Sequence, residues 1–304
     1  MKKTELVVLV GLPGSGKSTY ARKMRECGYQ VHSSDEIRRE LFGDEEIQKK
    51  KDKVFGILIK RVGENLEQGK SCVVDATNLG RKKRMFVLAN VQEIPCRKIC
   101  VLFVTPVDIC RRRNAARRRR VTDEVFDKML RAFECPGYYE GWDEIRPVFC
   151  QEKYRIPIEQ AENFSQDNPH HSLTLGQHME AARKYCEEHG YSEMLQQVAE
   201  YHDCGKLYTK QFCNKKGEVT ETAHYYGHEN YGAYLYLTHC CSEGKLKYPT
   251  WEDTLYAVQL INWHMRPLGV WRNSKKAQAR DQRLLGEAFY EDLMKLHEAD
   301  RAAH

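Results

Sequence analysis

Several features that are common in secreted and membrane proteins are missing from this chain of 304 residues. No apolar run approaches the ~18 residues of a membrane-spanning helix, and the apolar stretch 6–12 leads into a glycine-rich loop without a small-residue cleavage site. The 12 cysteines are spread along the chain and include no Cys-x-x-Cys pair. This distribution is unlike a disulfide framework or a cysteine zinc site. We therefore expect a cytoplasmic protein with reduced thiols and no membrane segment.

The charge is distributed unevenly between the two halves. Residues 1–150 contain 31 Lys+Arg against 21 Asp+Glu, a net charge of +10, whereas residues 151–304 contain 18 against 22, a net charge of −4. Seven of the ten residues in 111–120 are arginine. A basic half joined to a mildly acidic one favours a nucleic-acid or polyphosphate partner for the first half and a different role for the second.

The two halves also differ in hydrophobic pattern. In the first half, short apolar runs alternate with amphipathic stretches, which predicts an α/β domain with a parallel sheet flanked by helices. The expected strands are 6–10, 31–33, 72–75, 99–104 and 148–150. The pattern lapses in the proline-containing segment 151–167, which we interpret as a linker. Helical spacing then predicts an all-α domain over 168–304, with helices at 173–188, 191–204, 227–237, 251–264 and 278–303.

A phosphate-binding loop is the strongest motif in the sequence. The match to GxxxxGK[ST] begins at Gly11, directly after the first strand, and opens a helix, which is the context that this motif requires. Lys17 would reach the β- and γ-phosphates of ATP and the Ser18 hydroxyl would ligate Mg²⁺, while backbone N–H groups enclose the phosphates. The expected ATP-binding residues are Gly11, Gly14, Ser15, Gly16, Lys17, Ser18 and Thr19.

Four further residues of the first half point to phosphoryl transfer. Asp35 follows the expected second strand and could take a hydroxyl proton, although it could equally cap a helix. Arg38 lies one helical turn further on and would face an anionic acceptor, unless it is simply solvated. Arg113 and Arg117 are four apart, hence on one helical face, and could close on the triphosphate. A charge run is usually solvated, but seven arginines without acidic partners favour a polyanion.

The order of these motifs resembles the kinase module of phage polynucleotide kinase-phosphatase over residues 3–150. The matching segments are Gly11–Thr19, Ser34-Asp35-Glu36-Ile37-Arg38, Thr77-Asn78-Leu79 and Arg113-Asn114-Ala-Ala-Arg117. The resemblance implies that Asp35 is the general base on a 5′-OH, that Arg38, Thr77 and Asn78 bind the acceptor, and that Arg113 and Arg117 form a lid. Asp75 is offset by one from the phage pattern, and we assign it only as a Walker-B-like candidate.

In the second half, histidines and aspartates occur in an order that suits a metal centre. The expected ligands are His178, His202, Asp203, His228, His264 and Asp300, with His224 as an alternative to His228. A single helical histidine is usually an ordinary core or surface residue, but the ordered set is more specific. Mixed nitrogen and oxygen ligands suit Mn²⁺, Fe²⁺, Co²⁺, Ni²⁺ or Zn²⁺ rather than Mg²⁺.

This pattern resembles the HD phosphohydrolase superfamily over residues 168–304. His202-Asp-Cys-Gly-Lys206 matches its HDxGK form, which places Lys206 by the substrate phosphate and implies that Asp203 bridges two ions. The segments around His228 and His264 are similar to the HD domains of tRNA CCA-adding enzymes, which hydrolyse 2′,3′-cyclic phosphates and phosphomonoesters. The Asp-x-Asp motif of the phage enzyme's phosphatase does not occur after residue 150.

Together the two resemblances predict a bifunctional enzyme that heals RNA ends. It would phosphorylate a 5′-OH from ATP with Mg²⁺ and hydrolyse a 2′,3′-cyclic phosphate or 3′-phosphate with one or two transition-metal ions. Expected partners are RNA or tRNA ends and an RNA ligase. Two alternatives stay open: a small-molecule kinase fused to a nucleotide phosphohydrolase, and a non-catalytic, ATP-dependent RNA-binding switch.

Overall fold

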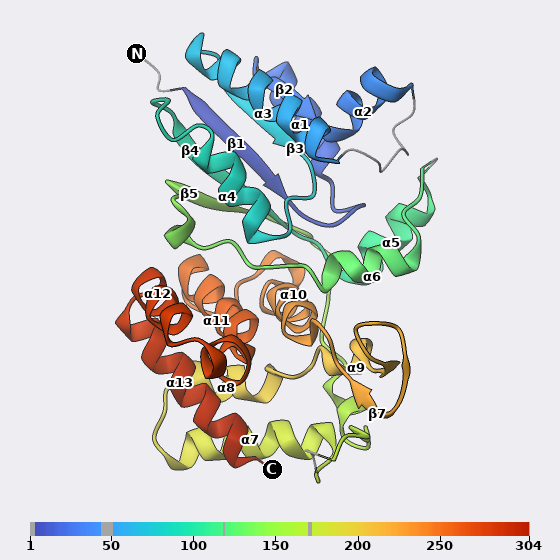
Figure 1. Cartoon of the computed structure of the whole chain (residues 1–304), viewed down its shortest axis with the longest axis vertical. Coiled ribbons are helices and arrows are strands. Elements are labelled where there is room, and N and C mark those ends of the chain that lie inside the picture. The colour runs from blue at the N-terminus through green and yellow to red at the C-terminus, as the bar shows by residue number, and fades with distance from the viewer. Residues whose placement is uncertain (1–3, 44–50, 118, 170–171, 304) are drawn as a thin grey trace. The chain divides into compact units, whose positions relative to one another are not determined.

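A computed structural model describes residues 4–43, 51–117, 119–169 and 172–303. The chain divides into two compact units (Figure 1). The first comprises residues 1–126 and 136–150, and the second comprises 127–135 and 151–304. Within the described residues, no helix is both long enough and apolar enough to cross a membrane.

The first unit is built on a parallel five-stranded sheet with the order β2-β3-β1-β4-β5. Its central strands are almost entirely apolar and buried, as expected for a parallel sheet that is covered on both faces. The strands are β1 (Glu5–Val10), β2 (Gln30–Ser33), β3 (Cys72–Asp75), β4 (Arg97–Val104) and β5 (Glu144–Phe149). The parallel α/β fold predicted from the alternating pattern is therefore confirmed.

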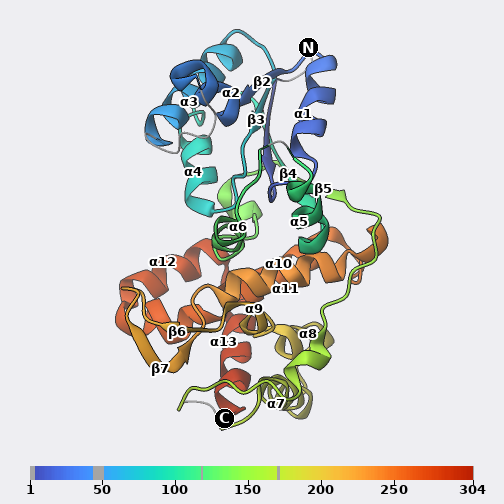
Figure 2. The ribbon, with the colours of Figure 1, turned by 90° about the vertical axis from the view of Figure 1, so that its right-hand side faces the viewer.

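Helices cover both faces of this sheet, with α1 on one side and α3 and α4 on the other (Figure 2). Because the carboxyl ends of parallel strands meet at one edge, the phosphate loop after β1 and the segments after β2 and β3 converge there. The helices of this part of the chain are α1 (Lys17–Glu26), α2 (Ser34–Phe42), α3 (Lys51–Glu67), α4 (Arg81–Ala89), α5 (Val107–Ala115) and α6 (Asp123–Leu130). A short 3₁₀ turn spans Tyr138–Glu140.

The second unit is a bundle of packed helices. Its last helix, α13, packs against α7, α8 and α11, and α10 packs along α11. The helices are α7 (Leu175–Glu188), α8 (Glu193–Tyr201), α9 (Lys206–Thr209), α10 (His228–Cys240), α11 (Trp251–Trp263), α12 (Lys275–Leu285) and α13 (Glu287–Ala302). The helix expected over 278–303 is two helices, because Gly286 breaks it with a φ of 85°.

The all-α prediction for the second half is wrong in one place. Strands β6 (Gln211–Cys213) and β7 (Val219–His224) form an antiparallel hairpin. Asn214 accepts hydrogen bonds from the backbone N–H groups of Lys216 and Glu218, and Gly217 has a φ of 85°. This is turn chemistry of the kind that favours a hairpin, although residues 219–224 carry no hydrophobic alternation.

Two segments lie in a different unit from the one expected. Residues 127–135 pack with the second unit, where Asn262 bonds the backbone of both Phe133 and Cys135 and Asn230 donates to the Arg131 carbonyl. The expected linker 151–167 also belongs to the second unit. Ile156 within it is fully buried, so this segment is part of the packed structure rather than a flexible connection.

Candidate functional site

The phosphate loop connects β1 to α1, and its glycines and its contact with α5 define its conformation. Gly14 and Gly16 have φ values of 81° and 105°, which only glycine adopts readily. A Cβ atom at Gly14 would lie 2.4 Å from the Cys110 carbonyl oxygen, so α5 lies directly against the loop. Ser15 Oγ is buried and has no hydrogen-bond partner among the described residues. A hydroxyl without a partner, beside the first turn of a helix, suits a bound phosphate oxygen.

Lys17 is buried at the start of α1 and its Nζ donates to the Leu12 carbonyl oxygen at 2.7 Å. Burial lowers its pKa to about 8, although the nearby Asp75 carboxylate acts in the opposite direction. Burial raises the pKa of Asp75, and a hydrogen bond from Ser18 and the charge of Lys17 oppose this shift. Ser18 and Asp75 thus present two oxygen ligands of the type that Mg²⁺ prefers, at the place where the motif requires them.

Asp35 lies in the first turn of α2, but it is not the helix cap. The Ser33 hydroxyl accepts hydrogen bonds from the N–H groups of Asp35 and Glu36 and caps the helix instead. Asp35 Oδ1 pairs with Arg38 Nη1 and lies 3.2 Å from Arg119 Nη1. The Asp35 side chain is 43% exposed, so its carboxylate remains accessible to an acceptor.

The two expected lid arginines do not lie on one helical face. Helix α5 ends at Ala115, and Arg117 lies beyond it, with its N–H bonded to the Asn114 carbonyl at 3.1 Å. Like charges one turn apart destabilise a helix, which explains why the arginine run does not extend it. Both Arg113 and Arg117 are exposed, and the charge of Arg117 reaches Lys17 and contributes to lowering its pKa.

The sequence analysis did not single out Arg119, which contacts Asp35 in the structure. Its position in the arginine run was the only signal in the sequence. It also placed Asn78 at the acceptor, whereas the structure places this side chain in the interior. Asn78 is fully buried and its Nδ2 donates to the Leu9 carbonyl, while the Thr77 carbonyl accepts a hydrogen bond from Gly11 N–H. The segment after β3 therefore supports the phosphate loop. The Asn78 side chain is not exposed to solvent, and its Oδ1 has no hydrogen-bond partner among the described residues.

The same segment is supported by a fully buried ion pair. Arg84 on α4 makes two hydrogen bonds to the Glu140 carboxylate, at 2.6 and 2.8 Å, and both side chains are inaccessible to solvent. The Arg84 guanidinium also donates to the carbonyls of Asn78 and Leu79. These contacts fix the backbone that contacts Gly11.

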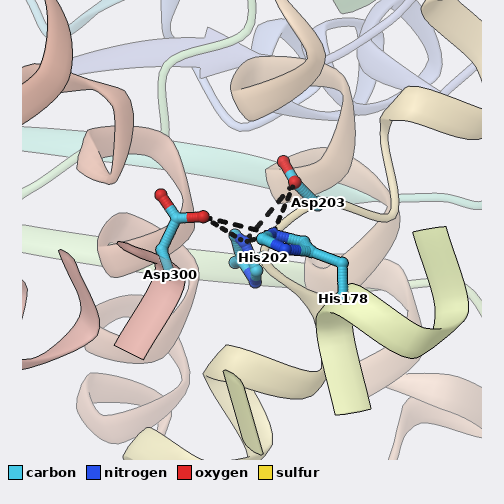
Figure 3. A group of neighbouring side chains, drawn as sticks. All are labelled: His178, His202, Asp203 and Asp300. Carbon is cyan, nitrogen blue, oxygen red and sulfur yellow. Dashed lines mark hydrogen bonds and ion pairs between the residues drawn. The ribbon is translucent and has the colours of Figure 1, made fainter. Parts of the chain in front are cut away.

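In the second unit, one group of four buried residues forms a candidate metal site. His178 on α7, His202 and Asp203 after α8, and Asp300 on α13 direct their side chains toward one another (Figure 3). His178 Nε2 lies 3.1 Å from Asp300 Oδ1, 3.4 Å from Asp203 Oδ2 and 3.3 Å from His202 Nε2. These distances are close enough for all four residues to ligate one ion.

A second group shares Asp203 with the first. His228 Nε2 lies 3.1 Å and His264 Nε2 lies 3.6 Å from Asp203 Oδ1, and the two imidazole nitrogens are 3.3 Å apart. Asp203 thus faces one histidine pair with each of its oxygens. Gly205 allows this approach, because a Cβ atom there would lie 2.1 Å from the His228 carbonyl oxygen.

The hydrogen bonds of the four histidines prepare them for metal ligation. Each Nδ1 lies within 3.0 Å of a backbone carbonyl oxygen, which fixes the proton on Nδ1 and leaves Nε2 directed at the carboxylates. Two facing neutral Nε2 atoms are both acceptors, so each pair needs a proton or a metal ion between its members. In the absence of a metal ion, a protonated His178 donates hydrogen bonds to Asp203 and Asp300, which raises the pKa of its imidazole to about 10 although burial opposes protonation. A bound metal ion would take the place of this proton. The donor set therefore fits divalent ions.

The structure also places two residues near the ligand groups, His224 and Lys206. His224 lies on β7, stacks on Tyr226 and is not a member of either group, whereas His228 is. Lys206, expected at the substrate phosphate, pairs with Asp203 Oδ2 at 2.7 Å and is 5% exposed. Its ammonium group is therefore fixed at the edge of the first group of ligands.

Comparisons with known proteins match part of this chain. Residues 6–136 match the AAA domain family. The chain is 29% identical over 148 residues to the L-seryl-tRNA(Sec) kinase of Methanococcus maripaludis, covering 45% of this chain and 56% of that protein. It is 30% identical over 160 residues to the bifunctional polynucleotide phosphatase/kinase of Schizosaccharomyces pombe, covering 49% and 35%.

The matched segments thus span about a third to just over half of these relatives. Among solved structures, a chain of the Pnkp1/Rnl/Hen1 RNA repair complex aligns with a TM-score of 0.39 and 22% identity, over 42% of this chain and 43% of its own. The predicted HD phosphohydrolase domain stays a prediction. Residues 6–136 form a kinase-like P-loop domain that is related to polynucleotide kinases and to L-seryl-tRNA(Sec) kinase.

Proposed function

We propose that this chain is an RNA end-healing enzyme with two active sites. The first unit transfers the γ-phosphate of ATP to a 5′-OH end, and the second hydrolyses a 2′,3′-cyclic phosphate or 3′-phosphate at the other end. The observation that carries the proposal is the pair of buried ligand groups sharing Asp203, in a chain that also contains a kinase-like P-loop domain. A switch that only binds RNA needs neither Asp35 nor such a cluster.

In the kinase site, different residues bind ATP, bind Mg²⁺ and bind the acceptor. Lys17 and the N–H groups of the loop hold the phosphates of ATP, and Ser18 with Asp75 holds Mg²⁺. Asp35 takes the proton of the acceptor hydroxyl, while Arg38 holds a phosphate of the acceptor strand. Arg113 at the end of α5 and Arg117 just after it are exposed, and they stabilise the negative charge of the phosphoryl group in the transition state.

In the second site, the protein contributes a fixed set of ligands and one cation. His178, His202 and Asp300 would hold one ion and His228 and His264 another, and Asp203 belongs to both groups of ligands. Divalent ions bound there would polarise the phosphate ester and lower the pKa of bound water. Lys206 supplies a fixed positive charge for the phosphate of the substrate.

The test uses one RNA oligonucleotide with a 5′-OH and a 2′,3′-cyclic phosphate, incubated with ATP, Mg²⁺ and Mn²⁺ or Ni²⁺. Both ends are analysed by gel and mass spectrometry for wild type, Lys17→Ala and His202→Ala. We expect each variant to lose the chemistry of one end and to keep that of the other. Lys23→Ala, on the same helix as Lys17, and His224→Ala serve as matched controls with both activities.

A second acceptor is favoured by the similarity to L-seryl-tRNA(Sec) kinase, which is comparable in identity to that with polynucleotide kinase. In that case the acceptor is a hydroxyl group carried on tRNA rather than a 5′ end. The same assay with aminoacylated tRNA and with free nucleosides separates the candidates. Phosphorylation of free nucleosides but not of RNA would favour a small-molecule kinase fused to a nucleotide phosphohydrolase.

A further inference from the structure

Gln166 lies in the segment that the sequence pattern suggested to be a linker, yet it is 2% exposed. Its Oε1 accepts a hydrogen bond from Lys206 Nζ at 2.9 Å. Its Nε2 donates to the Leu173 carbonyl oxygen at 3.2 Å. Because Leu173 offers only an acceptor there, the amide orientation is fixed and the oxygen must face Lys206.

Gln166 also contacts the loop that carries His228. The Tyr225 hydroxyl donates to the Gln166 backbone carbonyl at 2.6 Å, and the Tyr225 carbonyl accepts from His228 Nδ1 at 2.7 Å. The Lys206 ammonium group lies 5.5 Å from the centre of the Tyr225 ring. One residue therefore connects the Lys206 side chain with the backbone that orients a ligand of the second group.

The position of Lys206 follows from these contacts. Its Nζ has Asp203 Oδ2 at 2.7 Å on one side and Gln166 Oε1 at 2.9 Å on the other. A lysine side chain has many rotamers, and acceptors on two sides of its ammonium group restrict it more than one acceptor does. Loss of the Gln166 side chain removes an acceptor that lies on the other side of the ammonium group from Asp203.

We propose that Gln166 is a positioning residue that fixes the Lys206 ammonium group beside the metal ligands, where it anchors the phosphate of the substrate. This inference rests on the function proposed for the second unit and adds a residue to it. Gln166 does not touch the substrate itself. Its effect therefore depends on Lys206, and removing both residues should cost no more than removing Lys206 alone.

The experiment measures the binding of inorganic phosphate to the full-length protein loaded with Mn²⁺, by titration calorimetry. The variants are Gln166→Met, Lys206→Met and the double variant, with Gln196→Met as a matched control. Gln196 also donates to a backbone carbonyl in the same unit, that of Tyr191. Titration with Mn²⁺ alone, before phosphate is added, reports on the metal sites separately.

We expect Gln166→Met and Lys206→Met each to weaken phosphate binding by about tenfold, as for loss of a hydrogen bond to a charged group. The double variant should be no weaker than Lys206→Met, and Mn²⁺ binding should be unchanged in Gln166→Met and in the control. Gln166→Glu keeps an acceptor for Lys206 and should fold if Gln166→Met does not. It should also weaken phosphate binding, because it partly neutralises the ammonium charge.

Two results would overturn the inference, and they differ in what else they affect. Equal phosphate affinity in wild type and the Gln166 variants, with normal Mn²⁺ binding, rejects the positioning role and leaves the proposed function intact. Additive losses in the double variant likewise show that Gln166 does not act through Lys206. If wild type binds no Mn²⁺, the function proposed for the second unit is rejected, and the positioning role falls with it.

Discussion

Arg119 Nη1 lies 3.2 Å from Asp35 Oδ1, the same oxygen that pairs with Arg38. Two guanidinium groups thus converge on one carboxylate oxygen. Under the proposed function, the other oxygen takes the proton of the acceptor hydroxyl. This arrangement would orient the proton acceptor without blocking it. It also identifies a member of the arginine run that motif comparison alone did not single out.

The first prediction concerns this contact. Arg119→Ala should lower the kcat of phosphoryl transfer by about tenfold with little change in the KM for ATP, because Asp35 loses one of the groups that orient it. Steady-state kinetics with a 5′-OH oligonucleotide measure the effect. Arg120→Ala, an exposed neighbour, is the control. A faster reaction in Arg119→Ala would show instead that the contact is inhibitory.

The second prediction follows from the lowered pKa of Lys17, about 8. The charged amine binds the triphosphate, and this amine loses its proton as the pH rises through about 8. ATP affinity should therefore be constant at lower pH and fall above pH ~8 by up to about tenfold per unit.

Binding near pH ~8.5 should also take up a proton, because phosphate favours the charged lysine. Calorimetry in buffers of different ionisation enthalpy detects this uptake. In Lys17→Arg the side chain stays charged at every accessible pH, so any ATP binding that remains should show neither effect. An affinity for ATP that is independent of pH up to about pH 10 would contradict the lowered pKa.

The third prediction separates the two metal sites. His202→Ala removes a ligand of the first group and His264→Ala removes one of the second, so each should reduce the number of bound Mn²⁺ ions from two to one. Asp203→Ala should abolish both sites, because its two oxygens serve both groups.

Metal content after dialysis, together with calorimetry, measures this stoichiometry, and ATP binding by the first unit reports that each variant is folded. His224→Ala should retain both ions. Loss of an ion in His224→Ala but not in His228→Ala would reverse the assignment of these two histidines.

The fourth prediction concerns stability. Arg84→Met leaves the Glu140 carboxylate buried without its partner, so the free energy of unfolding should fall by about 3–5 kcal/mol. Urea unfolding monitors the change. Arg61→Ala breaks an exposed pair with Glu40 and should cost less than about 1 kcal/mol. Equal effects of the two substitutions would argue against a special role for the buried pair.

The sequence predicted those parts of the fold that depend on local pattern. Strands β1 and β3 are continuous apolar runs next to a glycine-rich or polar turn, and their positions agree with the structure within a residue. The hairpin β6–β7 was missed because its strands are short and polar, so they carry no hydrophobic alternation. The break at Gly286 was missed because a single glycine within helical spacing does not by itself end a helix.

The candidate site shows the same division. The histidine and aspartate order singled out six residues, and the structure brings their side chains together in two groups. Their role as metal ligands stays a prediction. Asn78 and Gln166 depended on tertiary contacts instead. Asn78 donates to the Leu9 carbonyl, and Gln166 contacts Lys206, which lies 40 residues further along the chain. Neither contact leaves a pattern in the local sequence.

The placement of residues 127–135 in the second unit affects how the two proposed activities can be separated. A cut after residue 150, where the composition changes, would remove this segment from its partners. Asn262 and Asn230 would lose the backbone groups that they bond, and the Tyr234 ring would lose its edge contact with Phe133. Neither fragment would then keep all the contacts that its part of the chain makes in the whole protein. Point substitutions at Lys17 and His202 are therefore better suited than truncation to remove one proposed activity at a time.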